Sequence, residues 1–208
     1  MTTEHETVRE RDLDRLLTFV DAVVAIAITL LVLPLVELTS DVTEDDSVRE
    51  LLHTHSDQLW SFVLSFVVIA QLWSSQHHAV RRMLRADPLV SRLLVVWMFT
   101  IVFLPFPTAL VATAGQQATT KVLYVGTITV STLCLALVAV VLGRRPDVTD
   151  GVADHDPRPA TISAALLLLA LGLMLAFPAA GYYPMFLLAL FPLFGRAVRI
   201  ARRAGAQR

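Results

Sequence analysis

The chain has 208 residues, of which 55% are hydrophobic and 17% are charged, and its mean hydropathy is +0.64. This composition excludes a soluble globular domain, because so large a surplus of apolar residues must face lipid. The net charge of −1 provides no basic surface for nucleic acid, and the single cysteine, Cys134, excludes an internal disulfide. The expected fold class is an all-α integral membrane protein.

A membrane-spanning helix needs ~20 apolar residues, and the sequence contains six segments of that kind. They are predicted at about residues 16–38, 57–79, 89–113, 120–142, 160–179 and 183–201. Residues 1–208 are thus expected to form a single six-helix unit without an internal repeat. The segment 144–159, which is rich in aspartate and proline, is predicted to be a flexible cytoplasmic linker.

The basic residues are distributed asymmetrically along these segments. All but two of the 17 lysines and arginines lie at the termini or in the loops after the second and fourth segments; the exceptions are Arg49 and Lys121. The positive-inside rule therefore predicts that both termini are cytoplasmic. The loop after the first segment is acidic between Glu37 and Glu50, either as a solvated loop or as a vestibule that attracts cations.

One face of the first segment carries a stripe of residues at heptad spacing. Because a helix advances 100° per residue, every member lies within about 60° of the central isoleucine. Such a stripe is typical of helices packed around a shared axis, either as a plain packing seam or as the wall of a pore. Its members are Arg15, Phe19, Ala22, Ile26, Thr29 and Leu33.

The polar residues of this segment have different expected environments. Asp21 falls about 140° from Ile26, on the opposite face. It lies inside the apolar boundary, so it should accept a hydrogen bond from another helix. Arg15 fits either an interfacial arginine that extends to the headgroups or a specific role. Thr29 could bond the carbonyl one turn back or face a pore. The helix is expected to be continuous until Pro34.

Arg15, Phe19 and Asp21 resemble the R-x-x-x-F-S-D signature that opens the first helix of the transmembrane-protein-175 family, the lysosomal and bacterial potassium channels. Three further stretches are similar to bacterial members of that family. They are AIAITLLVL at 25–33, LWSSQHH at 72–78 and FLPFPTALV at 103–111. Val20 departs from the signature, because the family usually has serine there, and the hydroxyl of that serine is therefore missing.

This resemblance implies a bacterial homotetramer of six-helix subunits whose pore is lined by four copies of the first helix. By the family's motif, the hydrophobic constriction falls at Ile26, and Thr29 and Leu33 form the next layers outward. The charge pair of Arg15 and Asp21, with Phe19 and His77, would brace the pore helix. The implied partners are further copies of the chain, membrane lipid and permeant potassium ions, with no cofactor and no bound metal.

The leading functional hypothesis is a passive cation channel of a bacterial plasma membrane, moderately selective for potassium because no filter motif such as TVGYG is present. A proton-coupled transporter that uses Asp21 and His77 as a relay is the alternative. A membrane oxidoreductase that ligates haem through histidines is a third hypothesis, but paired histidines at opposing depths are missing. No nucleophile–base set or phosphate loop favours an enzyme.

Overall fold

The computed structural model describes residues 2–38, 47–81, 83–114, 117–145 and 148–149, with side chains from residue 11 onward. Within this part of the chain, the regular elements are helices, together with one isolated β-bridge. The predicted fifth and sixth membrane segments, 160–179 and 183–201, lie outside the described residues. Most of the acidic loop and most of the predicted linker lie outside them as well.

Seven helices make up the described part of the chain. Two are short, α2 and α3, and the remaining five form the body of the bundle. They are α1 (Thr2–Leu30), α2 (Leu33–Glu37), α3 (Val48–Thr54), α4 (Ser56–Val80), α5 (Pro88–Phe103), α6 (Pro105–Ala114) and α7 (Ala118–Gly143).

Among the described residues, four stretches are long and apolar enough to cross a membrane, and they fall where the sequence predicts its first four spans. Two of the stretches combine two helices each, α1 with α2 and α5 with α6. The stretches are Arg11–Glu37, Ser56–Val80, Pro88–Ala114 and Ala118–Gly143. A multi-pass membrane protein therefore follows from length and hydropathy.

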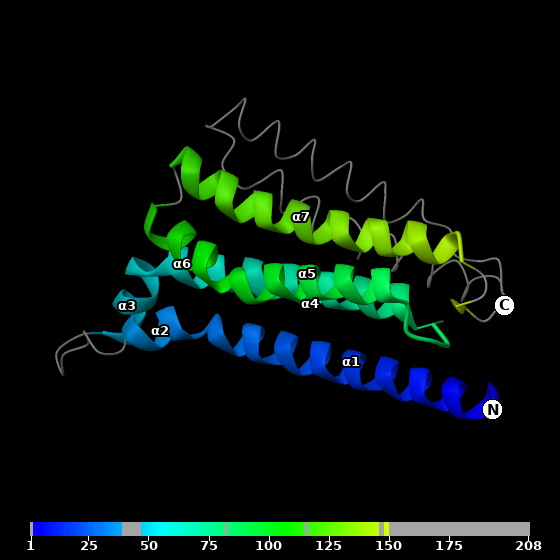
Figure 1. Ribbon diagram of the computed structural model, residues 1–208. Helices are drawn as coiled ribbons and strands as arrows, with labels where there is room; N and C mark the ends of the chain where they lie inside the picture. Colours follow the sequence, from blue (N-terminus) through cyan, green and yellow to red (C-terminus); the bar gives the residue numbers. More distant parts are fainter. Residues whose placement is uncertain (1, 39–46, 82, 115–116, 146–147, 150–208) are drawn as a thin grey trace, which may run out of the picture.

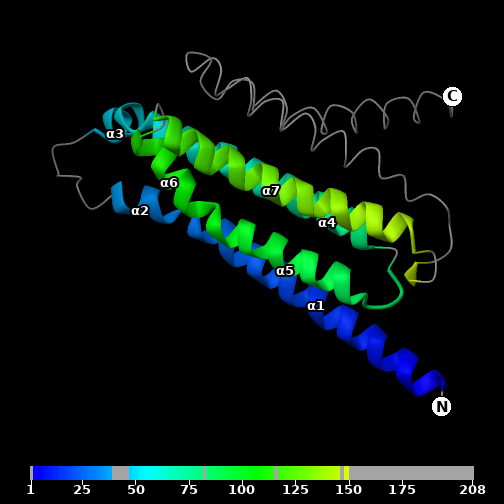
Figure 2. The ribbon, with the colours of Figure 1, turned by 45° about the horizontal axis from the view of Figure 1, so that its top comes forward.

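The long helices lie side by side, with α1 and α7 on opposite sides of α4 and α5 (Figure 1). Helix α5 packs against both α7 and α1, and α4 packs against α6, α7 and α1. The short helices α2 and α3 gather with α6 at the end of the bundle that is remote from the N-terminus (Figures 1 and 2). The main apolar core lies between α1, α4, α5 and α7 and contains the fully buried Trp97 and Tyr124.

Both breaks within spans occur just before prolines. A proline has no N–H and its ring collides with the carbonyl four residues earlier, so the helix ends ahead of it. Helix α6 begins at Pro105. Helix α1 already ends at Leu30, and the amide of Val32 turns to the carbonyl of Thr29 at 3.2 Å. The expectation of a first helix continuous to Pro34 is therefore wrong by about one turn.

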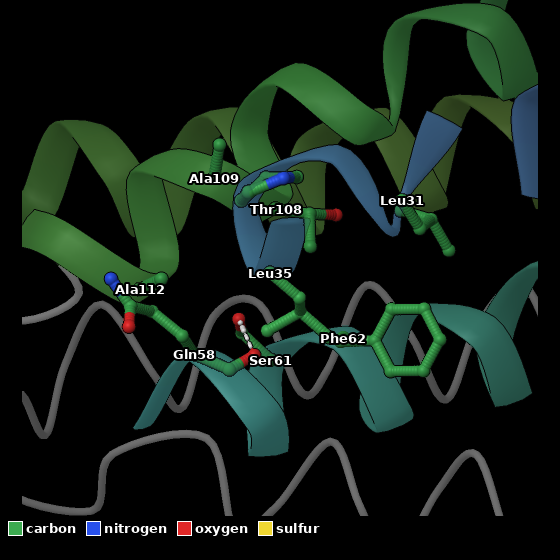
Figure 3. A pocket seen from close by; sticks show the side chains of 9 residues that line it. Leu31, Leu35, Gln58, Ser61, Phe62, Thr108, Ala109 and Ala112 are labelled. Carbon is green, nitrogen blue, oxygen red and sulfur yellow. Dashed lines mark hydrogen bonds between the residues drawn. The ribbon is translucent and has the colours of Figure 1, made fainter. Parts of the chain in front are cut away.

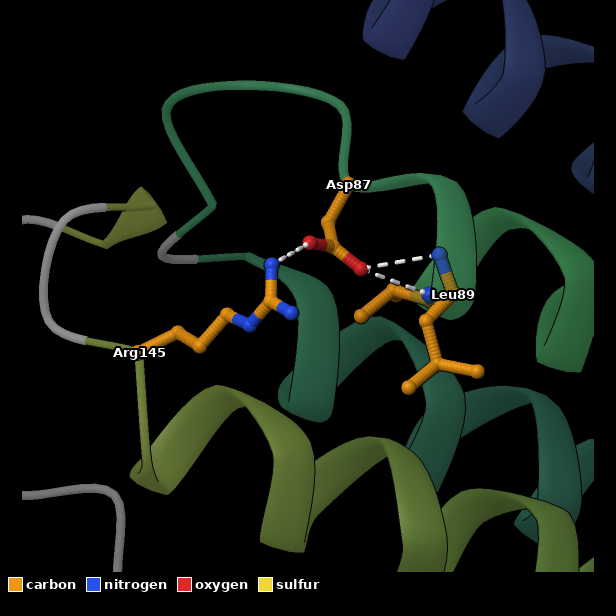
Figure 4. A network of polar contacts seen from close by, with 4 residues as sticks. Asp87, Leu89 and Arg145 are labelled. Carbon is orange, nitrogen blue, oxygen red and sulfur yellow. Dashed lines mark hydrogen bonds and ion pairs between the residues drawn. The ribbon is translucent and has the colours of Figure 1, made fainter.

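A polar clip joins α5 to α7 at the N-terminal end of the bundle (Figure 4). Asp87, only 3% exposed, caps α5 by accepting hydrogen bonds from the amides of Leu89 at 2.9 Å and Val90 at 3.0 Å. The guanidinium of Arg145, just after α7, lies 2.7 Å from its other carboxylate oxygen. Arg145, near the start of the segment predicted to be a flexible linker, is therefore held against the start of α5.

The backbone reinforces the clip next to this ion pair. The amide of Leu84 donates to the carbonyl of Val148 at 2.9 Å, and Met83 forms a β-bridge with Thr149. The loop between α4 and α5 is thereby tied to the chain that follows α7. The sequence did contain a signal for the cap, because aspartate followed by proline is a helix-start pattern.

Replacing Asp87 with alanine is expected to lower the free energy of unfolding by about 1–3 kcal/mol, because α5 loses its cap and Arg145 its partner. Arg145→Gln should cost less, about 0.2–1 kcal/mol, because the arginine is half exposed. Thermal unfolding in detergent, followed by tryptophan fluorescence, measures both. An unfolding midpoint for Asp87→Ala equal to that of the unmodified chain would show that the clip contributes nothing.

Candidate ion pathway on the first membrane helix

Helix α1 has one face in the core of its own chain. Leu13, Val20, Val24 and Ala27 are buried there at 5% exposure or less, and Leu31 continues the row beyond the end of the helix. Their spacing of three, four or seven residues places them on one side of the helix. This buried face fixes how α1 is rotated within the subunit, and so determines which residues point away from it.

The predicted stripe lies on the opposite, uncovered face of α1, and its last member, Leu33, lies beyond the helix end on α2. Phe19, Ile26 and Leu33 are 56%, 59% and 51% exposed. Arg15 and Thr29 are exposed as well. Large apolar side chains exposed along one face of a helix mark a surface that meets lipid or another chain. The single chain therefore presents the whole predicted stripe outward.

Thr29 provides the one hydroxyl in the outer half of this row. The hydroxyl donates to the carbonyl of Ile26 at 2.7 Å, as one of the two sequence readings anticipates. A hydroxyl has a single proton and two acceptor lone pairs. With the proton used on the backbone, the oxygen presents acceptor capacity to whatever faces it. The helix-bonded threonine is thus compatible with contact to a cation.

Asp21 is held from outside its own helix, by α4. Its carboxylate accepts a hydrogen bond from the indole Nε1 of Trp73 at 2.8 Å, and the bond lies at the exposed edge of the α1–α4 contact. The ring of His77, one turn further along α4, lies 6.0 Å from the ring of Trp73, centroid to centroid. The structure thus brings Asp21, Trp73 and His77 together, and the direct donor is Trp73.

Sequence reasoning did not assign this donor to Trp73. The available signal was the four-residue spacing between Trp73 and His77, which places both on one side of α4. The indole N–H of a tryptophan that is shielded from water usually donates a hydrogen bond to a protein acceptor. The ring of His78 bonds the carbonyl of Ser74 at 2.6 Å. Among the described residues, no group of His, Cys, Asp and Glu could hold a metal ion.

These features define a class of protein: a multi-pass helical membrane protein whose first helix exposes an ordered, mostly apolar face with one hydroxyl. Residues 15–105 match the family described as the endosomal/lysosomal potassium channel TMEM175. The resemblance to this family that the sequence predicts is thereby confirmed over these residues, which include the stripe and Trp73.

A solved structure is similar over most of the chain. It is the crystal structure of a lysosomal potassium-selective channel TMEM175 homolog from Chamaesiphon Minutus, with a TM-score of 0.68 and 23% sequence identity. The similarity covers 87% of this chain and 96% of that one. At this identity the likeness establishes the shared fold. No curated protein matches the chain.

Proposed function

We propose that the chain is a subunit of a potassium-permeable cation channel, a homotetramer with four copies of α1 around a central pore. The observation that carries the proposal is the row of outward-facing residues on α1, which a single chain leaves uncovered. The family match over residues 15–105, and the structural likeness to a potassium-selective channel, support the same function.

Within this proposal the layers of the pore follow from the order of the residues along α1 and α2. Ile26 forms the hydrophobic constriction, because four apolar side chains that meet at an axis make a ring that excludes water. Thr29 offers hydroxyl oxygens to a partly hydrated cation one turn further, and Leu33 forms the outermost layer. Discrimination is moderate because the sequence has no carbonyl-lined filter motif.

The residues flanking this row brace the pore helix. Asp21, held by Trp73 and neighboured by His77, ties α1 to α4. Arg15 and Phe19 lie at the N-terminal end of this row of residues. The protein resides in a bacterial plasma membrane with both termini in the cytoplasm, as the distribution of basic residues favours. Potassium is the permeant ion, and no cofactor takes part.

The proposal favours a channel over a proton-coupled transporter because of the contact at Asp21. A relay from Asp21 to His77 would pass through Trp73, whose indole N–H donates a hydrogen bond but has no lone pair to accept a proton. Asp21 itself lies within the unbroken helix α1, and the helix breaks fall between α1 and α2 and between α5 and α6.

Purified full-length protein is expected to be a tetramer, because one row on one helix cannot enclose a path. Native mass measurement or subunit counting in mild detergent tests the assembly. Recordings in lipid bilayers under a potassium gradient test conduction and should give a reversal potential displaced toward that of potassium. A stable monomer or dimer, or a bilayer without current, would contradict the proposal.

A further inference from the structure

The break between α1 and α2 leaves backbone carbonyls without their helical donors. In a continuous α-helix the amide of Leu35 would donate to the carbonyl of Leu31, but it donates to Val32 instead, at 2.9 Å. Pro34 has no N–H for the carbonyl of Leu30. In a membrane such oxygens need a partner from a neighbouring helix, a hydroxyl or a water molecule.

A small pocket lies directly at this break (Figure 3). It comprises about 210 Å³ of empty space, including its open side. Its walls come from the break itself and from α4 and α6. The lining residues include Leu31, Pro34, Gln58, Ser61, Thr108 and Ala112.

The pocket contains a polar atom that lacks a protein partner. The side-chain oxygen of Gln58 is buried, and no donor among the described residues reaches it. The neighbouring hydroxyls are already committed, since Ser61 donates to the backbone carbonyl of Gln58 at 2.9 Å. Thr108 lies 2.8 Å from the carbonyl of Leu104 and 2.8 Å from the hydroxyl of Ser65. The pocket therefore combines unsatisfied acceptors with little donor capacity.

We infer that this pocket binds a water molecule, which donates to the side-chain oxygen of Gln58 and to the backbone oxygen of Leu31. The space that the centre of a water-sized sphere can reach in the pocket is about 10 Å³, which is about the room that one water molecule needs. A cation is disfavoured, because burying a charge without a counter-charge costs far more than burying a dipole. The bound water replaces the helical hydrogen bond missing at the break and joins the break between α1 and α2 to α4.

The Leu31–Val32 break is a hinge for the outer end of the pore-lining element, and the water restrains it. Helix α2 carries Leu33, whereas Ile26 lies on the unbroken part of α1. Motion at the hinge therefore moves the Leu33 layer and leaves the Ile26 ring in place. This consequence for the pore rests on the proposed function, while the water site itself does not depend on it.

Two measurements on the full-length protein in lipid nanodiscs test the inference. A map that resolves ordered water elsewhere should contain a peak within hydrogen-bonding distance of the Gln58 side-chain oxygen. Hydrogen–deuterium exchange of a peptide covering residues 31–37 should be about tenfold faster in Gln58→Leu, because the Leu31 carbonyl loses its bridge. Pro34→Ala should slow this exchange, because the alanine supplies a backbone N–H that can donate to the carbonyl of Leu30.

Matched variants separate the pocket from general effects. Gln117→Leu makes the same change at an exposed position outside the pocket and should leave the exchange of residues 31–37 unchanged. Ala112→Leu fills the pocket and so expels the water by a second route, which serves if Gln58→Leu fails to fold. This variant should also speed the hydrogen–deuterium exchange of residues 31–37. An absent peak, or exchange in residues 31–37 unaltered by these pocket variants, overturns the inference. Loss of potassium current by the unmodified protein would overturn only the proposed function.

Discussion

Replacement of Ile26 by asparagine is expected to raise the single-channel conductance severalfold and to weaken discrimination between potassium and sodium. Four isoleucines at a symmetry axis form an apolar ring, which closes by expelling water rather than by binding ions. Asparagine brings amide groups that keep water in the ring. The side chain is already 59% exposed in the single chain, so the substitution leaves the core of the subunit intact.

The result is measured in bilayer recordings with potassium and sodium on opposite sides. Thr29→Val is the first comparison, and it should lower discrimination without opening the ring, because it removes the hydroxyl oxygen but no bulk. Val102→Asn, at an exposed position on α5, introduces the same amide away from α1 and should leave the current unaltered. Unchanged conductance and ion preference in Ile26→Asn would mean that the constriction lies elsewhere.

The acidic loop between α2 and α3 should influence these currents less than the ring does. Its charges act through solvent, and their field is screened beyond about 8 Å at physiological ionic strength. Neutralising Glu37 and Glu50 should therefore reduce current only in low salt. A comparison of recordings at low and physiological ionic strength measures this effect, and equal loss at both would show direct contact with the permeating ion.

The sequence predicted the four spans within the described residues well, because about 20 consecutive apolar residues have few alternatives to a spanning helix. The heptad spacing also grouped Phe19, Ile26 and Leu33 into one stripe, and all three are exposed in the single chain. Both results depend on local periodicity, which can be recognised directly in the order of residues along the chain. Hydropathy alone was less informative about where a helix breaks inside a span, as at Leu31.

Contacts between segments distant in the sequence could not be predicted in the same way. The pairing of Asp21 with Trp73 depends on how α1 is rotated against α4, which many core side chains determine jointly. Sequence reasoning anticipated a donor but could not choose it. The ion pair of Asp87 with Arg145 depends on the end of α7 reaching the start of α5. Such long-range geometry follows from packing, and no residue pattern within either segment encodes it.

Replacement of Asp21 by alanine is expected to reduce the yield of assembled tetramer about tenfold while ion preference stays near that of the unmodified protein. Asp21 follows Arg15 by six residues, and its hydrogen bond with Trp73 lies at the edge of the contact between α1 and α4. Lipid or a neighbouring subunit would cover it there, so an abandoned indole N–H finds no water to replace the carboxylate. An unsatisfied donor of this kind costs about 1–3 kcal/mol, and 1.4 kcal/mol corresponds to a factor of ten.

Size-exclusion chromatography of matched preparations measures the yield, and bilayer recordings of the surviving tetramer measure selectivity. Asp21→Asn keeps an acceptor oxygen and should restore much of the assembly, whereas Trp73→Phe removes the donor and should repeat part of the defect. Rescue by asparagine matters because it separates the hydrogen bond from the charge: a site that needed the negative charge would fail with asparagine as it does with alanine. Normal assembly together with altered ion preference in Asp21→Ala would place this carboxylate in the ion pathway and not behind it.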